Sequence, residues 1–252
     1  MIAGVAAGLR HLGGGISFMA RNPTLALLGM VPPLIVSAVL LGALVGLGFS
    51  LQVITDVLTG WASGDLRTVL RWVFGAVVML VGIILAVIAF SSLTLLVGTP
   101  VYERISLAVE HDRGGVPGEQ TEPLLAGLGR SIVQSLGLLA LSVLLAIPIF
   151  LLGLIPAVGG ILGAVAGAIV GGTMVTMELL GGPFDRRGRR RLGEKFGAGR
   201  GHRAEVLGFG IPVFLLFSIP LVQVVLFPAA TAGGTLLARS LLGEPVAVRK
   251  SS

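Results

Sequence analysis

Five arginines fall within six residues and form the densest concentration of charge in the sequence. They are Arg186, Arg187, Arg189, Arg190 and Arg191. Such a cluster can bind nucleic acid, hold a small anion, or mark the inner face of a membrane protein beside anionic headgroups. Only Phe184 and Phe196 are aromatic nearby, which is too few for a base-stacking platform. The sequence therefore favours a topological role at lipid headgroups over nucleic-acid binding.

The three histidines lie in separate segments, with no carboxylate at metal-ligand spacing. They are His11, His111 and His202, and we expect solvated side chains and no metal site. The sequence has no cysteine, no G-x-S-x-G elbow, no phosphate-binding G-x-x-x-x-G-K and no H-E-x-x-H. We therefore expect neither a catalytic residue nor a cofactor. Glu178 ends the longest uncharged segment, where it either pairs with Arg186 or Arg187 or couples to protons.

Composition predicts the kind of secondary structure that positions these residues. Of the 252 residues 54% are hydrophobic and only 12% are charged, against about 25% in soluble domains. Four long segments carry no charge at all, namely 22–55, 72–102, 131–177 and 206–238. Each exceeds the roughly 20 apolar residues that cross a bilayer. The sequence predicts an all-α polytopic membrane protein, with residues 1–252 as a single membrane domain in contact with lipid.

Length and breaking residues predict how these segments cross. Segments 22–55 and 72–102 are each expected to cross once, as long transmembrane helices. Segment 131–177 has Pro156, Gly159 and Gly160 near its middle, which predicts a helical hairpin. Segment 206–238 is interrupted by prolines and is too short for two full crossings of about 20 residues each. It is therefore expected to be a re-entrant hairpin.

Charge predicts the orientation. With these crossings, sixteen of the eighteen Lys and Arg residues lie on one side, which the positive-inside rule makes the cytoplasm. That side holds both termini, the basic loop 178–205 and the tail 239–252.

Residues 1–21 are expected to form an amphipathic helix along the cytoplasmic membrane surface. Its apolar stripe comprises Val5, Leu9, Leu12, Ile16 and Met19. Asn22 and Pro23 then read as the N-cap and first-turn proline of the first crossing helix.

Small residues recur at intervals of four in two segments. Gly159, Gly163, Gly167 and Gly171 form such a strip, as do Gly42 and Gly46. We expect these strips to be close helix contacts, either within the fold or between subunits.

The order of these features resembles the CysZ and etoposide-induced-protein family of membrane proteins. The stretches that carry the resemblance are ARNPTLALLGMVPPLIVS (20–37), GTPVYERISLAVE (98–110), GLIPAVGGILGAV (153–165), GGPFDRRGRR (181–190) and SIPLVQVVLFPAATAGGTLL (218–237). The motif residues that it marks are Pro23, Pro100, Pro156, Gly159, Gly160, Pro183, Phe184 and Asp185. The resemblance implies a homo-oligomeric permease in a bacterial inner membrane that admits sulfate or another small anion.

Three hypotheses follow. The first is a channel-like anion permease in which Arg21, Asn22 and Thr24 offer a positive charge and hydrogen-bond donors at a helix start. The second is a non-transporting scaffold or envelope-biogenesis protein. The absence of an arginine pair supports it, because Pro23 is followed by Thr24 and Leu25 where sulfate-permease members carry two adjacent arginines. The family resemblance nevertheless favours the first hypothesis. The third, a membrane-embedded enzyme, has no convergent polar groups in the apolar segments to support it.

Overall fold

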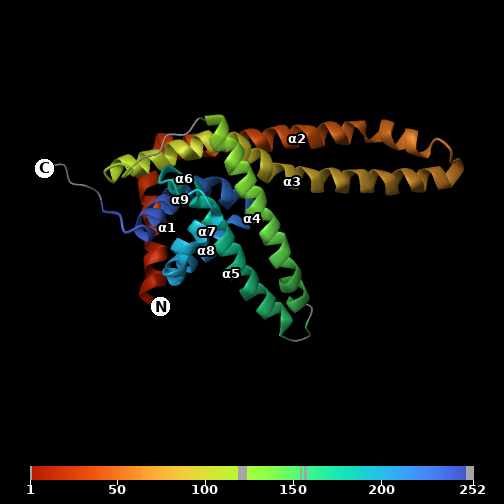
Figure 1. The fold of residues 1–252 in the computed structure, drawn as a ribbon. Helices are drawn as coiled ribbons and strands as arrows, with labels where there is room; N and C mark the ends of the chain where they lie inside the picture. Colours follow the sequence, from red (N-terminus) through yellow and green to blue (C-terminus); the bar gives the residue numbers. More distant parts are fainter. Residues whose placement is uncertain (1, 119–123, 154, 156–157, 248–252) are drawn as a thin grey trace. The chain divides into compact units, whose positions relative to one another are not determined.

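All regular structure in the described part of the chain is α-helical (Figure 1). The computed structural model describes residues 2–118, 124–153, 155 and 158–247. The helices are α1 (Ile2–Arg21), α2 (Pro23–Thr59), α3 (Gly64–Asp112), α4 (Leu124–Gly153), α5 (Gly159–Leu179), α6 (Gly181–Arg186), α7 (Leu192–Arg200), α8 (Arg203–Phe217) and α9 (Pro220–Leu241). They form two compact units: unit 1 comprises Met1–Gly29 and Tyr102–Ser252, and unit 2 comprises Met30–Val101.

Five helices in the described residues are long and apolar enough to cross a membrane. The candidate spans are Pro23–Thr59, Gly64–Ile83, Leu136–Gly153, Gly159–Leu179 and Val222–Leu241. The first four leave most of their apolar windows uncovered by protein, with at most 17% buried, whereas 78% of the last is buried. The α9 helix is therefore enclosed by protein, while the others present apolar surface that only lipid can satisfy.

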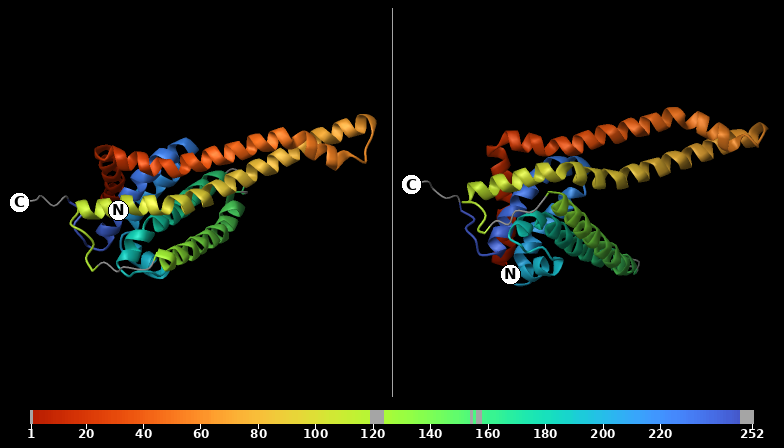
Figure 2. Two further views of the ribbon diagram at one scale, coloured as in Figure 1. Left: turned by 90° about the horizontal axis from the view of Figure 1, so that it is seen from above. Right: turned by 45° about the horizontal axis from the view of Figure 1, so that its top comes forward.

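Unit 2 is a hairpin of two long helices, the main parts of α2 and α3, which run side by side in both views of Figure 2. The turn between them ends at Gly64, whose φ of +62° lies in the left-handed region that favours glycine. Beside the turn, the Asp56 carboxylate accepts hydrogen bonds from Arg67 and Arg71 at 3.1 and 3.0 Å. These ion pairs close the end of the hairpin.

The helices run beyond the uncharged segments that predict them. The α3 helix begins before segment 72–102 and continues past it to Asp112, and the expected loop 178–205 contains α6 and α7. Charged residues such as Glu103 and Arg104 are good helix formers, so hydropathy marks the apolar part of a helix but not its ends. Pro100 lies inside α3 without ending it.

Within unit 1, α4 and α5 form a helical hairpin, broken where the sequence predicts (Figure 1). Pro156 itself lies outside the described residues, and α5 begins at Gly159. A Cβ on Gly159 would lie 2.5 Å from the Leu152 carbonyl oxygen, and one on Gly171 would overlap the Phe214 ring of α8. The glycine strip of α5 therefore makes contacts within the fold, against both α4 and α8.

The last hairpin consists of α8 and α9, which turn at Ser218 and Ile219. Pro220 begins α9, whereas Pro212 and Pro228 lie inside helices. The 15 residues of α8 extend about 22 Å and the 22 residues of α9 about 33 Å at 1.5 Å per residue. The two arms are therefore unequal, and only α9 has the length of a full crossing of about 30 Å.

The α1 helix packs against both α8 and α9. Its buried face comprises Gly8, His11, Leu12, Gly15, Phe18 and Met19. Of the apolar stripe that the sequence suggests, Leu12 and Met19 are buried, whereas Val5, Leu9 and Ile16 are 40 to 48% exposed. Glycine-mediated backbone contact, and not the apolar stripe alone, therefore selects the packed face.

Candidate functional site

The first two arginines of the cluster are held inside unit 1 by the short helix α6. Pro183 and Phe184 are buried, and Phe184, which is fully covered, belongs to the main hydrophobic core. Its backbone N–H donates to the Leu180 carbonyl at 3.0 Å, which ties α6 to the end of α5. Because Phe184 fixes this turn in the core, Arg186 and Arg187 are directed toward α3 and α9 and not toward solvent.

Glu110 of α3 is the centre of the resulting cluster, and it is only 1% exposed. Arg187 binds it through both terminal guanidinium nitrogens, with Nη1 to Oε1 at 2.7 Å and Nη2 to Oε2 at 3.0 Å. Arg239 of α9 donates from Nη1 to the same carboxylate. Glu244 completes the arrangement by accepting from Arg187 Nε at 2.6 Å and Nη2 at 2.5 Å.

Arg186 makes a second set of contacts with α3, one turn along that helix. Its Nη1 donates to the carboxylate of Glu103, and its Nη2 donates to Ser106 Oγ at 2.5 Å. Ser106 in turn lies 2.7 Å from Thr235 Oγ1 of α9. One turn before Ser106, the Tyr102 ring packs against the Phe227 ring of α9, with ring centroids 4.4 Å apart and ring planes tilted by 39°. The contacts therefore form a ladder between α3 and α9 that becomes ionic at one end.

We call this ionic end the ionic network. Its members are Glu103, Glu110, Arg186, Arg187, Arg239 and Glu244. Burial acts against the charged form of Arg187, but hydrogen bonds to Glu244 and Glu110 outweigh it, so the pKa of Arg187 is raised. Three positive groups face three negative ones, so the network is internally neutralised and carries little net attraction for an anion.

The five clustered arginines therefore divide in space. The side chains of Arg186 and Arg187 are only 8% and 5% exposed, whereas Arg189 and Arg191 lie on the surface. Arg190 is half-buried, and its carbonyl accepts from Gln134 Nε2 at 2.5 Å. The headgroup role predicted for all five does not fit Arg186 and Arg187, because their guanidinium groups are buried and bind Glu103 and Glu110.

Asp185, another motif residue, lies beside a buried lysine. Lys195 of α7 is 1% exposed, and its Nζ lies 3.1 Å from Asp185 Oδ1 and donates to Gln134 Oε1 at 2.5 Å. These contacts tie α6 to α7 and α4. Asp185 therefore has a structural partner that sequence spacing does not reveal.

The predicted anion-binding residues lie where α1 meets α2. Asn22 connects the two helices: its Nδ2 donates to the Phe18 carbonyl of α1 at 2.9 Å, and its own carbonyl accepts from the backbone N–H groups of Leu25 and Ala26 in α2. Arg21 and Thr24 are exposed on either side of it. Pro23 is the first residue of α2, as the sequence predicts. Arg21 thus lies between the negative end of the α1 dipole and the positive end of the α2 dipole.

A second buried polar cluster lies where α1, α8 and the end of α9 meet. His11 Nε2 is 2.7 Å from Glu205 Oε1, to which Ser240 Oγ donates at 2.6 Å. His202 Nδ1 lies 3.2 Å from Glu205 Oε2. Burial acts to raise the pKa of Glu205. Hydrogen bonds from Ser240 and His11 lower it by more than burial raises it, so the pKa lies below its ordinary value.

The expectation of solvated histidines is wrong for His11, which is 9% exposed. Its partner is 194 residues away, a separation at which no spacing rule operates. The sequence does place His11 on the same helical face as Gly8 and Gly15, at spacings of three and four residues. In the structure this face of α1 is buried.

In the described residues no group of His, Cys, Asp and Glu side chains is arranged to hold a metal ion. No curated protein matches the chain. A family model described as sulfate transporter CysZ/etoposide-induced protein 2.4 matches residues 11–228, most of the chain, which therefore belongs to this family.

Proposed function

We propose that this multi-pass membrane protein is a permease or channel for sulfate or another small anion. The observation that carries the proposal is the family match over residues 11–228. The apolar helices provide the membrane-embedded body that such a function requires. We expect no chemical transformation of the anion, since the sequence offers no catalytic motif.

The proposed anion contact is at the start of α2. Arg21 makes no hydrogen bond or ion pair among the described residues, so its guanidinium group is available to an anion. The α2 dipole adds positive potential at the same point, and Asn22 and Thr24 offer polar groups beside it. The buried arginines of the ionic network are less suitable because glutamates already neutralise them.

Radiolabelled sulfate uptake into proteoliposomes tests this proposal. We expect uptake with the unaltered chain and a loss of about tenfold in Arg21→Ala, from one lost charged contact. Arg10→Ala is the matched control, because Arg10 is an exposed arginine on the same helix. Absence of uptake of sulfate and of other small anions would overturn the permease proposal, whereas equal uptake in both variants would remove only the Arg21 site.

A second candidate is a non-transporting scaffold of the same family. The internally neutralised ionic network favours it, because that network fastens α3, α6 and α9 together and leaves no free buried arginine among its members. A stable protein partner recovered with the chain, together with absent anion flux, would select this function.

We further propose a bacterial inner-membrane location, with both termini and the basic segment 178–205 in the cytoplasm. The distribution of Lys and Arg supports this orientation, and a re-entrant path for residues 206–238 agrees with the short α8. Because the chain has no cysteine, single-cysteine variants can report the sides. We expect a membrane-impermeant reagent to label Ser63→Cys in intact cells and to leave Gly197→Cys unlabelled; the reverse pattern would overturn the orientation.

We also propose that the protein forms a homo-oligomer. Gly42 and Gly46 have nothing within 4 Å of an added Cβ, which leaves that strip of α2 free for a second helix. Crosslinking between Gly42→Cys chains would support the contact, and a strictly monomeric protein in mild detergent would oppose it.

A further inference from the structure

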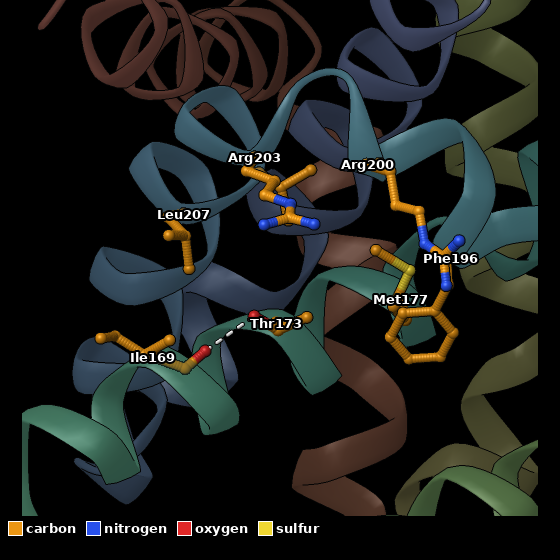
Figure 3. Close-up of a pocket in the computed structure, with 9 residues that line it drawn as sticks. Ile169, Thr173, Met177, Phe196, Arg200, Arg203 and Leu207 are labelled. Atoms are coloured by element: carbon orange, nitrogen blue, oxygen red, sulfur yellow. Dashed lines mark hydrogen bonds between the residues drawn. The ribbon is translucent and has the colours of Figure 1, made fainter. Parts of the chain in front are cut away.

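A cleft of about 370 Å³ lies in unit 1 between α5, α7 and α8 (Figure 3). Ile169, Thr173 and Met177 of α5 line it, spaced four residues apart on one helical face. Ile169 is 40% exposed and Met177 only 2%. The cleft therefore deepens from the outer surface of α5 toward the core.

Two arginines lie at the opposite side of this cleft. Arg200 ends α7 and Arg203 begins α8, and Figure 3 shows both side chains extending toward the residues of α5. Both are exposed, and neither makes a hydrogen bond or ion pair among the described residues. No acidic residue lines the cleft, and the nearby Glu205 uses its carboxylate for the contacts described above. The positive charge of the cleft is thus uncompensated.

The combination specifies an anionic amphiphile. A free inorganic anion would pair with the arginines but leave the apolar lining exposed to water. An uncharged apolar ligand would cover that lining but leave two guanidinium groups unused. A guanidinium matches a phosphate through paired hydrogen bonds, and it does so best where water is partly excluded.

The apolar side of the cleft is continuous with an exposed apolar face of α5. Ile161 and Val165 extend the line of Ile169 along α5, and they are 71% and 54% exposed. They belong to a helix long and apolar enough to span the bilayer. An acyl chain can therefore follow this face of α5 while its headgroup occupies the cleft. A volume of this size is at the low end for ligand sites and suits a headgroup with the first part of a chain.

We propose that this cleft binds one anionic phospholipid, with its phosphate between Arg200 and Arg203 and an acyl chain along the Ile169 face of α5. This site is separate from the Arg21 region and does not depend on anion transport. The lipid would hold α5, α7 and α8 together at the membrane surface.

The test places a fluorescent reporter in the cleft. Phe196 lines it, so Phe196→Trp in a Trp61→Phe, Trp72→Phe background gives a single tryptophan there. Vesicles of phosphatidylcholine carry a small fraction of either brominated phosphatidylglycerol or brominated phosphatidylcholine. We expect an apparent preference for phosphatidylglycerol of about tenfold in quenching, because two cations attract a lipid of net negative charge, whereas the choline of phosphatidylcholine neutralises its phosphate.

Matched variants separate a site from general surface attraction. Arg200→Gln with Arg203→Gln should reduce the preference to less than about twofold, whereas the exposed pair Arg189→Gln with Arg191→Gln should keep it. Equal effects of the two pairs, or no preference in the reporter protein, would overturn the proposal. Loss of the preference in inorganic phosphate, but not in sodium chloride of equal ionic strength, would assign the site to a free anion and also overturn it.

A second measurement avoids the tryptophan variant altogether. Native mass spectrometry of the chain with Phe196 intact should show one retained phosphatidylglycerol, which is lost in Arg200→Gln with Arg203→Gln and kept in the Arg189 and Arg191 control. Absence of retained lipid in the unaltered chain would contradict the proposal even if the reporter protein failed to fold.

Discussion

Gly15 provides the sharpest test of how α1 is packed. A Cβ at this position would lie 2.2 Å from the carbonyl oxygen of Ala229 and 2.5 Å from the backbone nitrogen of Gly233, both in α9. Gly13, two residues earlier in the same helix, has nothing within 4 Å and is exposed. The pair therefore gives the same chemical change in two opposite environments.

The expected free energies follow from two opposing effects. Replacing a helical glycine by alanine favours the helix by up to about 1 kcal/mol, so Gly13→Ala should raise the free energy of unfolding by about that amount. Gly15→Ala gains the same propensity, but its methyl group meets main-chain atoms, which cannot rotate away as a side chain can. Overpacking costs about 1–3 kcal/mol, and an overlap this close belongs at the upper end. We expect a net loss of about 2 kcal/mol.

The assay is reversible unfolding in mixed detergent micelles, followed by circular dichroism, with both variants and the unaltered chain under the same conditions. The two variants should differ by about 3 kcal/mol and in opposite directions from the parent. If Gly15→Ala is as stable as Gly13→Ala, the close approach of α1 to α9 is wrong.

Two further predictions concern the buried charges. Glu110→Ala should lower the free energy of unfolding by about 3–5 kcal/mol, because it leaves buried arginines without their carboxylate; Arg189→Ala, which changes an exposed arginine, should alter it by less than about 0.5 kcal/mol. Similar small losses in both variants, measured in the same micelle assay, would show that the ionic network contributes little. The pKa of Glu205 is lowered on folding, so its stabilisation is present above its unfolded pKa of about 4.3 and is lost as the pH falls through the folded pKa. Thermal midpoints measured from pH 7 to pH 3 should therefore fall less steeply in Glu205→Gln than in the unaltered chain, and parallel curves would contradict this assignment.

Much of the fold follows from local sequence properties. The uncharged lengths of 22–55 and 131–177 predict apolar helices, and the Pro156 and Gly159 region predicts the break between α4 and α5. Each of these features depends on composition over a few turns of chain, because lipid accepts only segments whose backbone hydrogen bonds are satisfied internally. The motifs likewise predict the family, since they depend only on residue order.

The ends of the helices could not be predicted from hydropathy and breaking residues. Hydropathy falls at Glu103, yet α3 continues to Asp112, because a charged helix beyond the hydrocarbon region is as regular as an apolar one within it. The prolines show the same limit. Pro220 begins a helix whereas Pro228 lies inside one, and the difference depends on the protein that surrounds each turn.

The sequence by itself determined that the chain is a helical membrane protein of this family, because length, apolarity and motif order are local properties. Only the tertiary structure decided which charges are buried. Arg187 meets Glu110 across 77 residues and His11 meets Glu205 across 194, because helix packing brings those side chains together. The same packing leaves Arg200 and Arg203 without partners above the apolar face of α5. A guanidinium group therefore stabilises the fold where packing places a carboxylate opposite it, and is free to bind a ligand where packing does not.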